Sequence, residues 1–282
     1  YCLPKTVASD SQSLAGRPYL VGNLADSRGL PQGDASMIEE KALYIDSIPC
    51  LVVVPTEDVR GVVIFYHGWS SCKELQSLRA RIMASYGYAV IVPDALNHGQ
   101  RGLIDYDDKQ AYPLFWQAVL QSTQEAGALI AYGEAHWPEQ KIFVAGHSMG
   151  GITALGVVAA QEKVCGAASL NGSGWWNESD RRFRAAWKID RTSEWQTLLP
   201  HIDAADPYNR VEVLSNKSVL LLNGGADDVV DKAAQALYAC KLKTAGADVQ
   251  SVIYDGLGHF VTTNMMGDVV QWLNGRIAAT GR

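Results

Sequence analysis

Residues 146–151, Gly-His-Ser-Met-Gly-Gly, decide the fold because of the sequence on either side of them. Residues 141–145 form a short apolar run of strand type, and residues 152–160 are rich in Ala, Leu, Val and Gly, which suits a helix. A Gly-x-Ser-x-Gly motif between a strand and a helix predicts a sharp turn that lifts the serine hydroxyl above the sheet edge. Small residues around the serine let the strand and helix pack closely. We therefore predict that Ser148 is a nucleophile.

A serine nucleophile needs a base, and the base needs a carboxylate that orients it. With this type of turn the expected chain order is serine, acid, histidine. His259 follows a predicted last strand, residues 249–254, and precedes a predicted helix from about residue 262 to 278. Flanking glycines suit a loop that carries an imidazole back over the sheet edge. We predict that His259 is the base; the alternative is a surface loop histidine.

The carboxylate is expected after residues 218–223, an apolar run that predicts a buried strand. Open α/β sheets place site residues at the carboxyl ends of their strands. Asp227 is favoured because a Gly-x-x-Asp-x-x-Val pattern starts at Gly224. Asp228 is the alternative, and Asp231 is predicted to cap a helix over residues 232–244.

An oxyanion hole is the fourth expected part, because negative charge develops on the carbonyl oxygen during acyl transfer. Residues 60–66 predict a strand, and His67, Gly68 and Trp69 leave it. We expect the backbone N–H groups of Trp69 and Met149 to be the donors. The Trp69 side chain is then expected to line the acyl pocket, and His67 is expected to hydrogen-bond the loop.

The loop at residues 94–102 follows a predicted strand at 88–93 and lies on the same rim. In one reading, His98 or Arg101 meets a substrate carboxylate or hydroxyl. We favour a hydrogen-bonded loop that braces the oxyanion turn. Asp94 and His98 alone are too few ligands for a metal. We expect no metal and no cofactor.

Composition sets wider bounds on the 282 residues. The chain is 48% hydrophobic and 19% charged, as in an ordinary globular protein, and its net charge of −6 argues against nucleic-acid binding. A small basic cluster between residues 181 and 188 is expected to be a solvated helix face. No run reaches the length of a membrane span. Five scattered cysteines favour a reducing compartment, and residues 1–5 do not resemble a signal peptide, so we expect a cytoplasmic location.

Strand and helix patterns alternate along the chain and predict one parallel sheet with helices on both faces. Residues 41–46 and 48–55 predict an opening hairpin, and residues 164–170 predict the strand after the elbow helix. A helix is expected from about residue 73 to 86. A long helical region is expected over 108–136, interrupted near Pro113.

Two segments break this alternation. Residues 1–36 have little periodicity and are expected to form an N-terminal arm, with a partly disordered leader as the alternative. Residues 37–282 are expected to be the catalytic domain, with a cap insertion at about 172–216 between the elbow half and the acid strand. Helices are expected there at 181–189 and 193–199. The insertion is rich in large aromatics, and we expect Trp175, Trp176 and Trp187 to line an apolar substrate pocket.

Together, the His67–Trp69 stretch, the 146–151 elbow, the Gly224–Val230 stretch and Gly258-His259 resemble the α/β-hydrolase superfamily across roughly residues 40–280. The stretches 67–74 and 94–102 are most similar to bacterial esterases related to dienelactone hydrolases and prolyl-oligopeptidase domains. Dienelactone hydrolases themselves use a cysteine nucleophile, whereas position 148 is serine.

The sequence therefore favours a cofactor-free serine carboxylesterase that acts on small to medium esters, as a monomer or homodimer. The same site suits a thioesterase or a hydrolase of short peptides and amides. A ligand-binding homologue without catalysis is the third alternative. Intact candidates at Ser148, Asp227 and His259 favour an enzyme.

Overall fold

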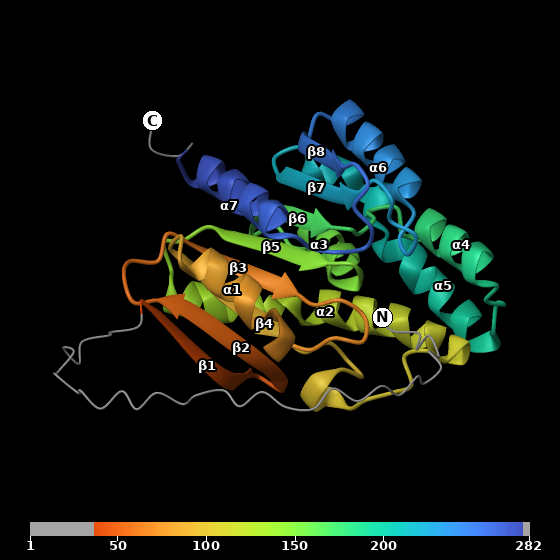
Figure 1. Ribbon diagram of the computed structural model, residues 1–282, viewed down its shortest axis with the longest axis horizontal. Helices are drawn as coiled ribbons and strands as arrows, with labels where there is room; N and C mark the ends of the chain where they lie inside the picture. Colours follow the sequence, from red (N-terminus) through yellow and green to blue (C-terminus); the bar gives the residue numbers. More distant parts are fainter. Residues whose placement is uncertain (1–36, 279–282) are drawn as a thin grey trace, which may run out of the picture. The chain divides into compact units, whose positions relative to one another are not determined.

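An eight-stranded sheet forms the centre of the computed structural model, which describes residues 37–278 (Figure 1). The strand order is β1-β2-β4-β3-β5-β6-β7-β8. β2 pairs antiparallel with β1 and with β4, and all pairs from β4 to β8 are parallel. The predicted α/β fold with a mostly parallel sheet is confirmed. The predicted N-terminal arm lies outside the described residues.

The bounds of the strands are β1 Ile38–Ile45, β2 Ile48–Pro55, β3 Gly61–Tyr66, β4 Tyr88–Pro93, β5 Ile142–His147, β6 Val164–Leu170, β7 Ser218–Gly224 and β8 Asp248–Tyr254. The α-helices are α1 Ser77–Ala84, α2 Tyr112–His136, α3 Met149–Ala160, α4 Trp176–Trp187, α5 Ser193–Ala205, α6 Lys232–Thr244 and α7 Thr263–Ala278. Short 3₁₀ helices are η1 Glu74–Gln76, η2 Gly99–Arg101, η3 Lys109–Ala111 and η4 Pro207–Leu214.

Alternation along the strands places the core on both faces of the sheet. On β5, Ile142 and Val144 pack with α2, α3 and α6, whereas Phe143 and Ala145 pack with α1 and α7. Successive strand residues point to opposite faces, so a strand that is apolar throughout must be covered twice. Figure 1 shows α1 and α7 together on one face and α2 on the other.

The helical region before β5 differs from the prediction at Pro113. α2 runs without a break from Tyr112 to His136, and Pro113 lies in its first turn. Proline is tolerated there because its missing N–H would have no intrahelical partner. The expected interruption is instead the boundary between η3 and α2.

The segment between β6 and β7 contains α4, α5 and η4, at the end of the molecule toward which β3 and β5 point (Figure 1). α4 begins at Trp176, five residues earlier than predicted. The reason is Asp206, whose carboxylate accepts the N–H groups of Trp176 (3.1 Å) and Asn177 (3.0 Å). A carboxylate 30 residues away thus caps the helix. No local sequence pattern could predict this contact.

A second buried carboxylate fastens this segment to α2. Asp180 Oδ1 accepts Tyr112 Oη (2.8 Å), Trp116 Nε1 (3.0 Å) and Trp195 Nε1 (3.1 Å). Asp180 Oδ2 pairs with the guanidinium of Arg184 at 2.7–2.8 Å. Arg184 is buried, so the prediction that this basic cluster is a solvated helix face is wrong for that residue. The ion pair with Asp180 holds the Arg184 guanidinium inside the protein.

None of the helices in the described part of the chain has the length and apolarity needed to cross a membrane.

Candidate active site

The turn after β5 holds Ser148 in a strained conformation, with φ 56° and ψ −118°. At the neighbouring glycines, the surrounding backbone leaves no room for a side chain. A Cβ on Gly146 would lie 2.3 Å from the carbonyl oxygen of Gly150, and one on Gly150 would lie 2.0 Å from that of Tyr66. Strain held by close packing is typical of functional turns. The geometry is that of the elbow expected from the sequence.

Backbone contacts fix this turn against the neighbouring strand. Ser148 N–H donates to the carbonyl of Leu170 at 2.9 Å, and α3 begins directly after the serine. The first N–H groups of a helix have no intrahelical acceptors and carry partial positive charge. Such groups suit the stabilisation of a developing anion beside Ser148.

The structure brings Asp227 and His259 together at the same edge of the sheet. Asp227 Oδ2 lies 2.8 Å from His259 Nδ1, and their side chains are 0% and 5% exposed. Asp227 Oδ1 accepts the N–H groups of Val229 (2.9 Å) and Val230 (3.0 Å), which orients the carboxylate. Asp228 is exposed.

Asp231 has the capping role predicted for it. Its Oδ1 accepts the N–H of Ala233 at 2.7 Å, at the first turn of α6. The three acids after β7 therefore separate by environment. One contacts the imidazole, one faces solvent and one caps a helix.

The loop after β3 packs directly against the elbow. A Cβ on Gly68 would lie 3.5 Å from Ser148 Cβ and 3.4 Å from the carbonyl of His147. Trp69 follows, and Ser70 has a left-handed φ of 58°. Within residues 37–278, the backbone N–H groups of Trp69 and Met149 form no hydrogen bond to a backbone carbonyl outside the helices and strands. Trp69 lies on the loop after β3, and Met149 is the first residue of α3, directly after the serine.

Two buried histidines brace this loop. His67 Nδ1 donates to the Gly68 carbonyl at 2.8 Å, so its Nε2 accepts the N–H of Ala95 at 3.0 Å. His98 Nδ1 likewise donates to the Leu96 carbonyl (2.8 Å), and its Nε2 accepts the N–H of Ser70 (3.2 Å). Burial lowers the pKa of His67 and lowers that of His98 to about 4, which keeps both rings neutral.

The loop at 94–102 has the bracing role favoured by the sequence. Asp94 accepts the backbone N–H of Lys73 (2.9 Å), the N–H of Gln100 (3.0 Å) and the buried Lys73 ammonium (2.7 Å). Arg101 forms a bidentate pair with Glu125, both bonds 2.7 Å. The loop therefore holds the start of η1 and the loop after β3 in place.

The predicted pocket tryptophans lie in different environments. Trp176 is fully buried, with its ring 5.6 Å from that of Trp116 and its Nε1 donating to the Ile152 carbonyl. Trp175 stacks on Tyr208 at 4.0 Å. Trp187 is exposed. The structure does not bring these three rings together.

Trp69 instead joins a row of rings that ends at Trp187 and includes Tyr112 and Phe115, which the sequence analysis did not single out. Its ring contacts Phe115 (5.7 Å between centroids), which continues through Tyr112 (6.0 Å) and Phe183 (5.3 Å) to Trp187 (5.8 Å). Tyr112 and Phe115 are three residues apart on α2, so they share a face of the helix. That spacing was the available signal. The row runs from the loop after β3 to α4.

His147 is a second residue that the sequence did not single out. Its ring centroid lies 5.0 Å from that of His259. Burial, followed by the charge of His259, lowers the pKa of His147 to about 3. A neutral ring thus lies against the His259 imidazole.

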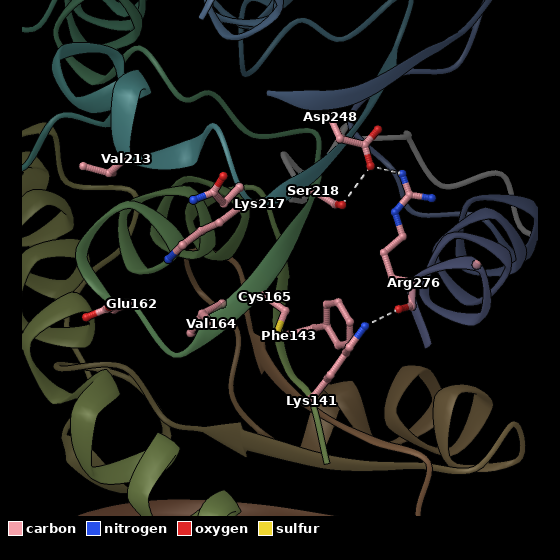
Figure 2. A pocket seen from close by; sticks show the side chains of 12 residues that line it. Lys141, Phe143, Glu162, Val164, Cys165, Val213, Lys217, Ser218, Asp248 and Arg276 are labelled. Atoms are coloured by element: carbon pink, nitrogen blue, oxygen red, sulfur yellow. Dashed lines mark hydrogen bonds and ion pairs between the residues drawn. The ribbon is translucent and has the colours of Figure 1, made fainter. Parts of the chain in front are cut away.

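A cavity of about 710 Å³ lies at the other end of the strands (Figure 2). Val164, Ser218 and Asp248, the first residues of β6, β7 and β8, line it. Among its charged groups, Asp248 pairs with Arg276 at 2.6 Å. The ammonium groups of Lys141 and Lys217 donate to backbone carbonyls. It is remote from the elbow, since Ser148 follows the carboxyl end of β5.

The residues at the carboxyl edge of the sheet are of the kinds that acyl transfer needs. In the part of the chain that the structure describes, no three His, Cys, Asp or Glu side chains are placed to hold a metal ion. A strained serine, an imidazole bonded to a carboxylate and paired N–H groups are the parts needed for acyl transfer.

Comparisons with known proteins place the chain among hydrolases. Residues 48–267 match the model of the family described as "Dienelactone hydrolase family". The chain is 34% identical over 202 residues to Esterase YjfP of Escherichia coli, an alignment that covers 69% of this chain and 80% of that protein.

Solved structures share the fold. The structure of TT1662 from Thermus thermophilus superimposes with a TM-score of 0.73 at 19% identity, covering 87% of this chain and 99% of that one. A highly thermostable carboxyl esterase from Bacillus coagulans gives a TM-score of 0.63 at 14% identity, covering 85% and 99%. At these identities the likeness concerns the fold alone.

Proposed function

The chain belongs to the dienelactone hydrolase family, and from that premise we propose that it is a serine carboxylesterase that uses Ser148, His259 and Asp227. The observation that carries the proposal is the 2.8 Å contact between His259 Nδ1 and Asp227 Oδ2 at the sheet edge that also presents the strained Ser148. Each of the three residues follows the carboxyl end of a different strand, where open α/β sheets place their sites.

The contact to Asp227 assigns the tautomer of the base. Because Nδ1 donates to the carboxylate, Nε2 carries the lone pair that can take a proton. His259 would remove the proton from the Ser148 hydroxyl as Oγ attacks the ester carbonyl. Asp227 would stabilise the imidazolium that forms.

The remaining steps return every proton. The N–H groups of Trp69 and Met149 would bind the negatively charged oxygen of the tetrahedral intermediate. The imidazolium would then protonate the leaving alcohol and leave an acyl-serine. Water, deprotonated by His259, would attack the acyl group, and Ser148 would recover its proton as the carboxylic acid leaves.

We also propose that residues 172–216 act as a cap over this site, within a catalytic domain of residues 37–282. Its helices α4 and α5 lie at the end toward which the parallel strands point (Figure 1). The row of rings from Trp69 to Trp187 joins the oxyanion loop to α4 and would provide an apolar wall for small to medium acyl groups.

The test is hydrolysis of p-nitrophenyl esters from acetate to laurate by the wild type and by Ser148→Ala. We expect activity that is highest on short chains and falls roughly 10⁶-fold in the variant. Ser122→Ala, which alters another buried serine on α2, is the matched control and should keep its activity. A folded Ser148→Ala protein with wild-type turnover would overturn the nucleophile assignment. Turnover of thioesters or peptides alone would move the proposal to another acyl bond.

A further inference from the structure

Asn171 follows β6, between the elbow strand β5 and the acid strand β7. It is 0% exposed and has a left-handed φ of 50°. Asparagine and glycine adopt this conformation most readily among the natural residues. A buried amide in this conformation must find its hydrogen bonds inside the protein.

Both halves of the amide are bonded to loops that carry proposed catalytic residues. Asn171 Oδ1 accepts the N–H of Gly224 at 2.8 Å, and Gly224 is the last residue of the strand before Asp227. Asn171 Nδ2 donates to the carbonyl of Phe260 at 2.9 Å, and Phe260 follows His259. One side chain therefore joins the start of the loop that carries Asp227 (the acid loop) to the loop that carries His259 (the histidine loop).

The third loop is joined through the neighbouring residue. Leu170 accepts the N–H of Ser148 at 2.9 Å, and the backbone N–H of Asn171 donates to Leu222 at 2.7 Å. The dipeptide Leu170-Asn171 thus contacts the serine turn, the acid strand and the histidine loop.

Two further backbone bonds join the acid loop to the part of the chain that precedes His259. Gly225 N–H donates to Tyr254 (2.7 Å) and Ala226 N–H to Leu257 (2.8 Å). Both acceptors precede His259 in the chain. The Asn171 amide adds the tie that follows His259, so the imidazole is held from both directions along its loop.

We propose that Asn171 is a positioning residue that sets the distance between His259 and Asp227, an inference that rests on the proposed function of these residues. Small displacements of a catalytic group cost much rate, since about 1 Å of misplacement can lower kcat roughly 10²-fold. Asn171 acts without touching the substrate, through the two loops it bonds.

The first experiment compares Asn171→Gly with Asn223→Ala. Glycine keeps the left-handed backbone and removes only the amide. Asn223 is an equally buried amide that bonds Gly172 at 3.3 Å and neither catalytic loop. We expect kcat of Asn171→Gly to fall roughly 10²-fold with little change in KM, whereas Asn223→Ala loses stability and keeps kcat.

The pH profile separates positioning from a merely structural role. His259 is faced by Asp227 and by His147. If the carboxylate contact loosens, the imidazolium is stabilised less, so the acid limb of kcat/KM should move to lower pH in Asn171→Gly. A variant that loses stability but keeps the wild-type kcat and pH profile would overturn the proposal.

A second variant and a second readout cover the case in which glycine prevents folding or no substrate is found. In Asn171→Asp the introduced carboxyl can donate to Phe260 only when protonated, so the loss in kcat should grow as pH rises. The downfield NMR signal of the His259 Nδ1 proton reports its bond to Asp227 without turnover. An unchanged signal in both variants would refute the positioning role. If this NMR signal disappears in both variants, the positioning role stands. If in addition the wild type hydrolyses no ester, only the proposed function is refuted.

Discussion

At the carboxyl ends of the parallel strands, several buried polar side chains each hold two backbone groups, whereas at the amino ends the exposed Asp248 carboxylate bonds other side chains. His67, His98 and Asn171 each bond two backbone groups at the first edge. At the opposite edge, Asp248 pairs with Arg276 and with Ser218 beside the 710 Å³ cavity.

This difference distinguishes the candidate site from the edge that holds the cavity. Exposed ion pairs contribute little to stability and fix no backbone conformation. Buried polar groups that hold backbone N–H and carbonyl groups can maintain strained turns, such as those at Ser148 and Ser70. The arrangement of polar groups, more than the volume of a cavity, marks the edge that we propose to be functional.

Within this comparison, the largest effect is expected from two neighbouring acids at the carboxyl edge. Asp227→Asn should lower kcat roughly 10⁴-fold, because an amide in place of the carboxylate favours the wrong imidazole tautomer. Asp228→Asn, at an exposed position, should leave kcat near that of the wild type. Steady-state kinetics on p-nitrophenyl acetate decide the ranking. A reversed order would assign the orienting role to Asp228.

The next effect concerns the buried carboxylate that fastens α4 to α2. Asp180→Ala should lower the free energy of unfolding by about 3–5 kcal/mol, because it leaves the buried guanidinium of Arg184 and three ring donors without their acceptor. Urea denaturation measures it. Asp203→Ala, an exposed acid on α5, is the control. If Asp180→Ala lowers the free energy of unfolding no more than Asp203→Ala does, solvent replaces these bonds.

A smaller effect follows from the neutral histidines. Burial lowers the pKa of His98 to about 4, below the value of about 6.5 in the unfolded chain. The unfolded state therefore binds more protons between these values, and stability should fall as pH decreases from 6.5 to 4.

Thermal unfolding of the wild type and of His98→Gln across this range tests the assignment. The variant should lose less stability on acidification than the wild type does. His201→Gln, which alters an exposed histidine, should keep the wild-type slope. Identical slopes for all three proteins would contradict the assignment.

The smallest effect is expected at the amino-end cavity. Asp248 is 56% exposed, so Asp248→Ala should change the free energy of unfolding by about 0–1 kcal/mol and leave kcat unchanged. Urea denaturation at low and high salt is the measurement. A loss in kcat would break the contrast between the two edges and implicate the cavity in turnover.

Much of the fold was readable because its signals are local. The bounds of β2, β4, β6 and α6 coincide with the predicted ranges, since apolar runs and turn residues mark them directly. The elbow could be placed because glycine, serine and glycine must follow one another to make that turn. A histidine after the last strand and an acid after β7 then followed from strand order, and the structure brings them within 2.8 Å.

What only the tertiary structure decided are contacts between residues far apart in the chain. Asp206 caps α4 across 30 residues, Asp180 bonds Tyr112 across 68, and Asn171 reaches Phe260 across 89. Each residue alone fits a turn or a solvent-exposed helix. The sequence determined which groups stand at the ends of the strands. Only the packing of neighbouring strands and helices decided their partners, because a buried polar group bonds whatever the fold places beside it.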